Sequence, residues 1–207
     1  MGREMKYPGA LLIGLIFLGA FCGCAGRSYL MVNYQVPEAS QQLRGQKVHL
    51  RVTDQRSTES ILTTEAAHQL PDFIGLYNLT WMMPDQQSIQ AGELPLTKLF
   101  KTVLEKRLTT LGCRTTETSD EATPVLTIAL KRVTLDLQDY DWKADLGYDA
   151  TLSTAGHPTA KETIRGSAER VRIIGRKGAD KVLSDIFSDV VNRLDLIKMF
   201  KNARLIP

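Results

Sequence analysis

Hydrophobic positions recur with two different periods along this chain, and each period predicts one kind of element. Apolar side chains occupy every second position of residues 46–53, which is typical of a half-buried strand. They recur at steps of three and four residues in 95–111 and again in 179–200, which predicts two amphipathic helices. Pro95 suits the first turn of the earlier helix, and Gly112 suits the position after its end.

A strand-rich stretch occupies residues 125–174, where the alternation predicts an antiparallel meander of three strands. The apolar positions change parity near Lys131, and one extra residue there would return both sets to a single face. We therefore expect a β-bulge at this point of the first strand. Between the second and third strands, a register that pairs Tyr148 with Gly166 would set a large side chain against the smallest residue.

This order of strand, helix, three strands and helix (β-α-β-β-β-α) predicts the α+β class. We expect a two-layer sandwich in which the two amphipathic helices cover one face of a mixed, mostly antiparallel sheet. Residues 46–203 would make up this single domain. Residues 24–45 would form a tether, with a possible edge strand at 29–36, where apolar and polar side chains alternate. The segment 57–94 fits either a strand or an ordered loop.

The first residues carry the pattern of a secretory signal. Two basic residues precede an apolar run of about 13 residues, 9–21. A membrane-spanning helix needs about 20 such residues, so this run is too short to remain as a span. Beyond it comes the small residue Gly23, which Cys24 follows directly. We interpret residues 1–23 as a cleaved signal peptide and the chain as exported.

Cys24 after a small residue resembles the lipobox of bacterial lipoproteins. In that family the cysteine thiol takes a diacylglycerol, the signal is cut before the cysteine, and the new amine is acylated, for example with palmitate. The resemblance implies that Cys24 is lipidated and anchors the chain in a membrane. Ala25, rather than an aspartate, follows the cysteine, which is similar to the outer-membrane sorting pattern. The alternative is an ordinary cleaved signal peptide.

Charge and cysteine content narrow the class of partner. Loss of residues 1–23 removes two basic residues and one acidic residue, so the formal net charge falls from +3 to +2. Both signs are interspersed without a basic block, and we expect no nucleic-acid partner. Once Cys24 is acylated, Cys113 is the remaining thiol of the mature chain, so no internal disulfide is expected. We interpret Cys113 as a small buried hydrophobe.

Two short motifs resemble the YajG-type family of bacterial lipoproteins. Residues 48–56 (VHLRVTDQR) end a strand in an Asp-Gln-Arg turn, and residues 104–108 (LEKRL) lead to Gly112. The resemblance covers about 45–203 and implies an outer-membrane lipoprotein that faces the periplasm, with no catalytic residues and no cofactor. The element order is also similar to that of the auxiliary lipoproteins of envelope lipid transport and of the lipoprotein plug of the lipopolysaccharide translocon. Residues 57–94 exceed the family pattern, so no role is carried over to them.

Two groups of residues are candidates for a binding site. Asp54 and Arg56 form a polar pair at the end of a strand, where capping of the turn competes with a role in binding. The segment 57–94 contributes aromatic and methionine side chains, which are enriched at protein interfaces. These are candidates for contact with a protein partner: Phe73, Tyr77, Trp81, Met82 and Met83. The alternative is that they cover the sheet edge or the helix pair.

Candidate catalytic and metal-binding groups are scattered along the sequence. The three histidines fall on different predicted elements without metal-ligand spacing, and no Gly-x-Ser-x-Gly elbow is present. We therefore predict no metal, no cofactor and no catalytic residue. The leading interpretation is a lipid-anchored, non-enzymatic binding or scaffolding lipoprotein of the outer membrane, facing the periplasm, with a protein partner in the cell envelope. Two alternatives remain open: an auxiliary component of an envelope lipid-transport system, and a cell-envelope hydrolase.

Overall fold

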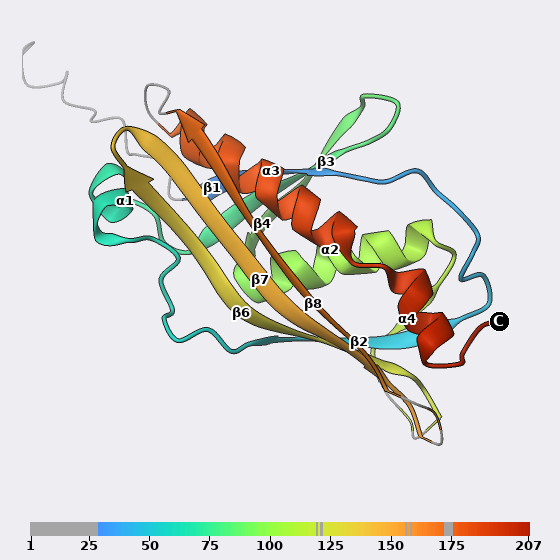
Figure 1. Cartoon of the computed structure of the whole chain (residues 1–207). Helices are drawn as coiled ribbons and strands as arrows, with labels where there is room; N and C mark the ends of the chain where they lie inside the picture. The colour runs from blue at the N-terminus through green and yellow to red at the C-terminus, as the bar shows by residue number, and fades with distance from the viewer. Residues whose placement is uncertain (1–28, 119, 121, 156, 158, 172–175) are drawn as a thin grey trace, which may run out of the picture.

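The computed structural model describes residues 29–207 except 119, 121, 156, 158 and 172–175, and it places helices between two β-sheets (Figure 1). The predicted signal peptide and Cys24 lie outside the described residues. The described elements follow in the order β1 (Tyr29–Gln35), β2 (Lys47–Asp54), α1 (Thr64–Gln69), β3 (Leu76–Met82), β4 (Ser88–Pro95), α2 (Leu96–Thr110), β5 (Arg114–Thr116), β6 (Val125–Gln138), β7 (Asp141–Ser153), β8 (Ala160–Val171), α3 (Lys177–Arg193) and α4 (Leu196–Asn202). Among these helices, none has the length and apolar character needed to cross a membrane.

The larger sheet contains five strands in the order β5-β2-β6-β7-β8. β2 runs parallel to both of its neighbours, and β6, β7 and β8 form the antiparallel meander that the alternation predicts. The predicted β-bulge is confirmed, because the register between β6 and β7 shifts between Leu130 and Arg132. Lys131 is the extra residue, and it allows both apolar sets of β6 to face the core.

The register between β7 and β8 differs from the predicted one by two residues. Tyr148 lies opposite Ile164, and Gly166 lies opposite Leu146. The helix above the strand, rather than the cross-strand neighbour, requires glycine at this position. A Cβ atom built on Gly166 would come within 2.7 Å of Cγ2 of Val190 in α3. Side-chain size across the strand pair was therefore the wrong criterion for this register.

Residues 57–94 fold into α1, β3 and β4, and they supply most of a second sheet. Its order is β1-β3-β4, with β3 in the centre, parallel to β1 and antiparallel to β4. β1 lies at the edge of this sheet, as the alternation in residues 29–36 indicates. The predicted order of elements contains one sheet rather than two, because β4 is exposed along most of its length and shows no apolar alternation.

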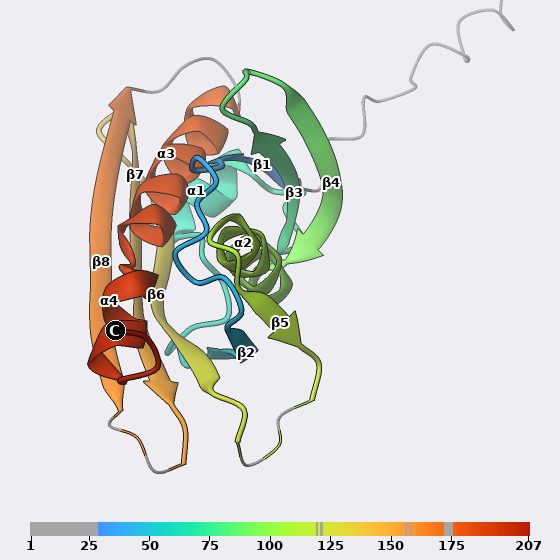
Figure 2. The same ribbon diagram turned by 90° about the vertical axis from the view of Figure 1, so that its right-hand side faces the viewer.

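The α+β class is confirmed, and α2 and α3 lie against the larger sheet. α3 contacts β7 and β8 on one side and β1 on the other, while α2 contacts both β2 and β3. Figure 2 shows the two helices between the sheets. Because they are covered on both sides, their apolar stripes are wide. The rings of Phe187 in α3 and Phe100 in α2 meet edge to face, with centroids 4.9 Å apart.

The predicted helix 179–200 is divided into α3 and α4. Leu194 adopts an extended backbone with ψ of 114°, and Asp195 starts the new helix by accepting a hydrogen bond from the Lys198 N–H at 2.9 Å. Aspartate is a preferred residue at this capping position, so Asp195 explains why one apolar stripe runs through two helices. α2, in contrast, agrees with the predicted bounds to within a residue.

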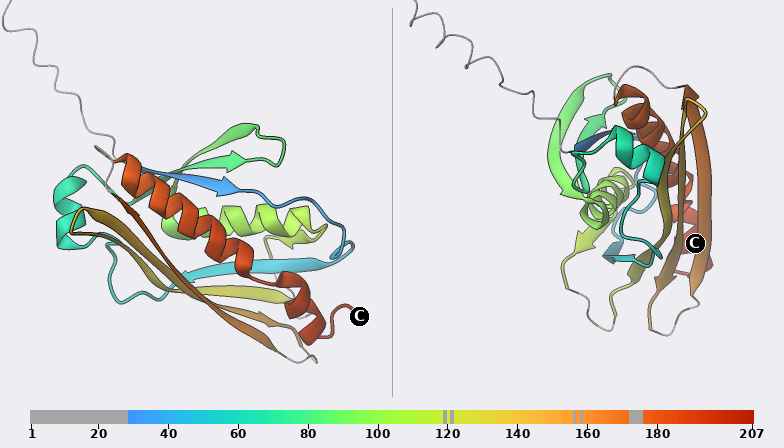
Figure 3. Two further views of the ribbon diagram at one scale, coloured as in Figure 1. Left: turned by 45° about the horizontal axis from the view of Figure 1, so that its top comes forward. Right: turned by 90° about the vertical axis from the view of Figure 1, so that its left-hand side faces the viewer.

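The outer edge of β1 is hydrogen-bonded to α3, which runs beside it (Figure 3). Ser184 and Ser188 accept hydrogen bonds from the backbone N–H groups of Asn33 and Gln35, at 2.9 and 3.1 Å. The helix presents polar residues to this edge at four-residue intervals, and we call them the polar row: Asp180, Ser184, Ser188 and Asn192. A helix ridge thus takes the place of a neighbouring strand and satisfies the edge of the sheet.

Candidate functional site

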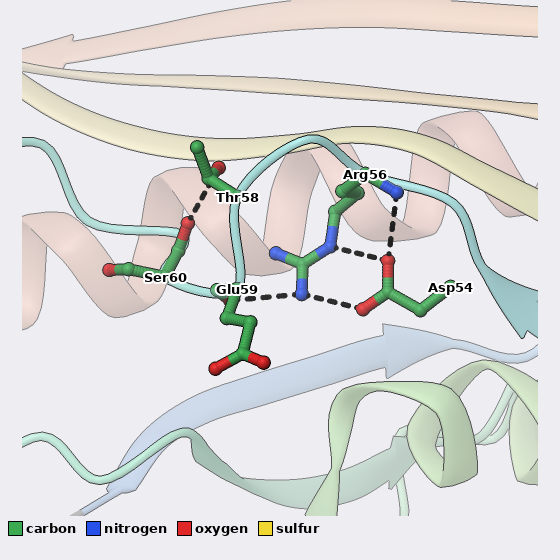
Figure 4. A network of polar contacts seen from close by, with 5 residues as sticks. All are labelled: Asp54, Arg56, Thr58, Glu59 and Ser60. Carbon is green, nitrogen blue, oxygen red and sulfur yellow. Dashed lines mark hydrogen bonds and ion pairs between the residues drawn. The ribbon is translucent and has the colours of Figure 1, made fainter.

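Asp54 and Arg56 form a closed polar pair where β2 ends (Figure 4). Nε and Nη2 of Arg56 donate to the two carboxylate oxygens of Asp54 at 2.9 and 2.7 Å. The Arg56 backbone N–H also donates to Asp54 Oδ1 at 3.1 Å, which is the turn-capping role that the sequence suggests. The hydrogen bonds from Arg56 hold the pKa of the Asp54 carboxyl below its usual range.

The Arg56 side chain is buried, with 7% of its surface exposed, although it belongs to a surface turn. Its Nη2 reaches back to the carbonyl oxygen of Glu59 at 3.0 Å. Nη1 is buried and has no hydrogen-bond partner in the described part of the chain. Figure 4 shows this nitrogen on the side of Ser60, away from Asp54. A buried donor without an acceptor costs free energy, so this end of the Arg56 guanidinium opposes the stabilisation that its other hydrogen bonds give.

The chain after Arg56 turns back and surrounds a cavity of about 530 Å³, which we call the Arg56 cavity. Ile61 and Thr63 bond to Leu135 on the free edge of β6, at 2.7 and 3.1 Å. α1 and the loop 70–75 then return the chain to the start of β3, and the first turn of α2 completes the wall. The cavity walls are mainly apolar and include Ile61, Leu70, Phe73, Tyr77 and Leu96.

The two candidate groups from the sequence meet at this cavity. Asp54, Arg56, Phe73 and Tyr77 all line it, although they belong to two separate sequence segments. The Phe73 and Tyr77 rings pack edge to face with centroids 5.6 Å apart. Tyr77 itself is 2% exposed, so its ring belongs to the core as much as to the cavity.

The other three members of the aromatic and methionine group lie at the opposite end of β3. Trp81 is half-buried and packs edge to face on Tyr34 of β1, with ring centroids 6.0 Å apart. Met83 packs against the core, and Met82 borders the groove between β1 and α3. Trp81 and Met82 therefore belong to β3, Met83 directly follows it, and the structure does not bring any of the three to the Arg56 cavity.

Electrostatics keep the polar wall of the cavity in one protonation state near neutral pH. Burial raises the pKa of the Tyr77 phenol, and the nearby Arg56 only partly opposes this shift. The phenol therefore stays protonated and remains a hydrogen-bond donor. Asp54 stays ionised because its pKa is lowered, so the charges of Asp54 and Arg56 cancel. The polar residues of the cavity therefore include a hydrogen-bond donor, Tyr77, while the Asp54–Arg56 pair contributes no net charge.

Burial or backbone contacts account for the cysteine and for one histidine that the sequence offers as candidates. Cys113 is buried, and burial raises the pKa of its thiol to about 11. His49 Nδ1 lies 3.0 Å from the carbonyl oxygen of Thr116 on the neighbouring strand. Within the described residues, no group of three His, Cys, Asp or Glu side chains is arranged to hold a metal ion.

Sequence reasoning missed three apolar residues that line the Arg56 cavity. Ile61, Leu70 and Leu96 come from a bridge to β6, from the end of α1 and from the start of α2. Ile61 and Leu70 are isolated hydrophobes in a segment without clear periodicity, and Leu96 belongs to the predicted helix 95–111, where its periodicity indicates core packing rather than a cavity wall. Thr63 offered one usable signal, since it caps α1 by accepting from the Ala66 N–H.

Comparison with known proteins gives a fold but no family. Neither a protein-family model nor a curated protein matches this sequence. The crystal structure of a Xanthomonas campestris protein of family DUF330 is similar over 84% of this chain and 97% of that protein, with a TM-score of 0.54 at 12% identity. At this identity the likeness concerns the fold alone.

Two lipoprotein structures are also similar, with lower scores. A minor lipoprotein from Acinetobacter baumannii matches 83% of this chain and 97% of its own length, at 9% identity and a TM-score of 0.41. The rare lipoprotein B from Shewanella oneidensis matches 77% of this chain and 98% of its own length, at 10% identity and a TM-score of 0.43.

Proposed function

We propose that this chain is a lipid-anchored, non-enzymatic binding module of the bacterial outer membrane that faces the periplasm. The observation that carries the proposal is the short distance along the chain between Cys24 and the folded domain. β1 begins at Tyr29, five positions after the cysteine. Five residues span at most about 17 Å when fully extended, so a lipid on Cys24 holds the domain against the membrane surface.

The end of the domain that carries Tyr29 supports this orientation. Tyr29 pairs with Leu76, which places the loop before β3 at the same end, and Ile74 in that loop is 67% exposed. The β6–β7 hairpin tip also lies at this end (Figure 1), with Tyr140 77% exposed and a left-handed φ of 81°. Val171, at the end of β8, is 73% exposed. Exposed aromatic and aliphatic side chains are typical of surfaces that rest on a membrane interface.

A binding role is supported by the Arg56 cavity. Its volume of about 530 Å³ falls within the range of small-molecule sites, roughly 300–1,000 Å³. Asp54 and Arg56 also have a structural role: Arg56 holds the Asp54 carboxylate, and that carboxylate caps the turn by accepting from the Arg56 backbone N–H. The YajG-type motif at residues 48–56 ends at this pair, which links the sequence resemblance to the cavity.

A second candidate function is an auxiliary role in envelope lipid transport. The mainly apolar walls of the Arg56 cavity favour it, because an accessory lipoprotein of such a system would contact lipid chains. In this case the protein partner would be the membrane complex of the transporter. Capture of partners from membranes, with the anchored chain as bait, separates the two candidates by identifying what is bound.

The anchor is tested by replacing the cysteine in the full chain. Wild type should be processed and should fractionate with membranes, whereas Cys24→Ala should stay unprocessed or appear as a released periplasmic protein. Cys113→Ala is the matched control, since it removes the buried thiol and should leave processing and fractionation unchanged. A Cys24→Ala chain that is processed and still fractionates with membranes would show that no lipid on this residue is needed.

A further inference from the structure

Arg132, Gly147 and Arg165 form one row across three neighbouring strands of the larger sheet, and we call them the arginine row. Arg132 of β6 lies opposite Gly147 of β7, and Gly147 lies opposite Arg165 of β8. A Cβ atom built on Gly147 would lie 3.9 Å from Cβ of Arg132 and 3.3 Å from Cγ of Arg165. Both arginine side chains therefore leave the sheet on the same face, one on each side of the glycine.

The arginine row belongs to the face of the sheet that points away from the helices. Leu146 and Tyr148, the neighbours of Gly147 along β7, are buried, and the Tyr148 hydroxyl donates to the carbonyl of Val190 in α3. Figure 2 shows α3 on the inner side of β7 and β8, toward the second sheet. The two arginines are exposed on the outer side, where they border a hollow of about 560 Å³.

Two departures from regular strand structure create this hollow. The β-bulge puts two consecutive cations, Lys131 and Arg132, on the exposed face, where regular alternation would bury one of them. Glycine at position 147 leaves the space between the arginines empty, although an added Cβ would meet only flexible arginine side chains and the carbonyl oxygen of Ile164 at 3.5 Å. Packing of the fold does not account for this glycine, whereas the approach of a ligand to the strand does.

The guanidinium groups of the arginine row have no partners, in contrast to the lysine beside them. Lys131 donates to Gln55 at 2.6 Å and lies 3.8 Å from a carboxylate oxygen of Asp149. Neither Arg132 nor Arg165 forms a side-chain hydrogen bond or ion pair with any residue that the structure describes. Like charges on neighbouring strands repel each other, and a bound anion would remove this repulsion.

The charges that line the hollow favour a doubly charged oxyanion. Three cations and one carboxylate, Asp145, give the lining a formal charge of +2. Asp145 accepts from Thr134 Oγ1 at 3.4 Å and lies two residues along β7 from Gly147, about 7 Å away. Because β6 and β8 are only about 10 Å apart, two arginine side chains can reach one ligand above the glycine. Two guanidinium forks match the oxygens of a phosphate, whereas a carboxylate needs only one fork.

From these observations we infer that the arginine row binds a phosphate group, held by the guanidinium groups of Arg132 and Arg165 above Gly147. None of these three residues lines the Arg56 cavity, so the inference goes beyond the proposed function and does not depend on the lipid anchor. Soluble phosphate compounds and lipid headgroups share this chemistry, and the test separates them.

The test uses the full chain, purified from membranes in a neutral detergent, with inorganic phosphate as the probe near neutral pH and at constant ionic strength. Two-dimensional NMR follows the Gly147 backbone amide and the arginine side-chain N–H signals. Saturable shifts are expected at Gly147, Arg132 and Arg165. Arg170 should change little, because its guanidinium is paired with Asp185 at 2.7 Å. Acetate, with a single negative charge, should bind more weakly than phosphate.

Four variants make the result specific. Arg132→Gln and Arg165→Gln should each weaken phosphate binding at least about ten-fold, the effect of losing charge-assisted hydrogen bonds. Gly147→Leu fills the hollow without a change of charge and should weaken binding to a similar extent. Arg170→Gln is the matched control, since it removes the same charge from β8 outside the hollow and should bind phosphate as wild type does.

Circular dichroism of each variant establishes that the fold is intact. Shifts that do not saturate would overturn the inference, as would undiminished binding by Gly147→Leu or acetate binding as tight as that of phosphate. An equal loss in Arg170→Gln and Arg165→Gln would also overturn it, because binding would then follow net charge alone.

The source of the phosphate is identified in the same assay. Glycerol 3-phosphate and a phosphatidic acid with two short acyl chains present the same group, and either one bound at the arginine row supports the site. Tighter binding of the phosphatidic acid would indicate a lipid headgroup, and equal binding would indicate a soluble phosphate compound. A chain that is lipidated on Cys24 but binds no phosphate contradicts this inference alone and leaves the anchored module standing.

Discussion

Gly166 is a position at which α3 packs closely on the larger sheet. A Cβ atom there would meet Cγ2 of Val190 at 2.7 Å and Cδ1 of Ile186 at 2.8 Å, both rigid, buried groups of the helix. At Gly147, on the neighbouring strand, the nearest atom to such a Cβ is Cγ of the flexible Arg165 side chain, at 3.3 Å. Two glycines in one sheet therefore face different constraints.

We predict that Gly166→Ala destabilises the fold and that Gly147→Ala does not. Overpacking of a close helix contact costs about 1–3 kcal/mol, whereas alanine at an unstrained position gains a few tenths through the unfolded state. Urea unfolding of both variants gives the two free energies of unfolding. Equal values for the two variants would contradict the close approach of α3 to Gly166.

Arg56 also sets the ionisation of Asp54. The hydrogen bonds of Arg56 lower the pKa of this carboxyl in the folded state, so the pair contributes stability above the usual aspartate pKa of about 3.9. That contribution is lost as the pH falls through the lower, folded-state pKa. The sequence predicted both residues and the turn they cap, but not the burial of the guanidinium, which depends on a later segment of the chain.

We predict that the Asp54 carboxyl titrates below its ordinary value in the wild type and returns toward it in Arg56→Gln. Carbon-detected NMR of the carboxyl resonance measures the midpoint directly. An Asp54 midpoint that does not move in Arg56→Gln would show that the pair does not form.

At the scale of elements, α3 packs on the larger sheet with its apolar stripe and bonds to β1 with its polar row. A single sequence pattern does not reveal both contacts. Its apolar stripe was predicted from periodicity and is buried against the larger sheet. Its polar row was missed because serine and asparagine on a helix usually face water, and the partner strand β1 lies more than a hundred residues earlier. The signal in retrospect is the four-residue spacing of small hydrogen-bonding residues.

We predict that Ser184→Ala together with Ser188→Ala destabilises the protein, although alanine is the better helix former. Each change leaves a backbone N–H of β1 without its acceptor, at a cost of about 1–3 kcal/mol per unpaired group. Ser167→Ala, at an exposed position of β8, is the control and should be nearly neutral. Thermal melting gives the order of stability of wild type, the double variant and Ser167→Ala. A double variant more stable than wild type would exclude an edge-covering role.

The same variants should change the state of association. An uncovered edge strand offers unpaired N–H and C=O groups to another chain. We therefore expect the double variant to form larger species at concentrations where Ser167→Ala stays in the wild-type form. Light scattering of the two proteins side by side gives the comparison.

At the scale of the whole molecule, the chain places two helices between two sheets and leaves a cavity where several segments meet. Local patterns predicted the class, the meander and the main helices, because each depends on periodicity within one segment. The second sheet escaped prediction, because β4 is polar and the parallel pairing of β1 with β3 joins segments 47 residues apart in register, as in Tyr29 with Leu76. The Arg56 cavity itself was not predicted: the sequence named Asp54 with Arg56 and, separately, Phe73 with Tyr77, and only the fold brings the two groups together.

Under the proposed function, one end of the domain would face the membrane. β1 starts at this end and the hairpin of β6 and β7 turns there (Figure 3). Ile74 and Gly75, in the loop before β3, line the Arg56 cavity. A lipid on Cys24 would fix that end within about 17 Å of the bilayer. Without that lipid, the proposed orientation of the domain would not follow.

The chemical state of the mature N-terminus tests the account most directly. Intact-mass and N-terminal peptide mass spectrometry of the chain purified from membranes should find Cys24 as the first residue, with a diacylglyceryl thioether and an acylated amine. Cys113 should remain an unmodified thiol in the same sample. A mature chain that begins at another residue, or one with an unmodified Cys24, would contradict the account.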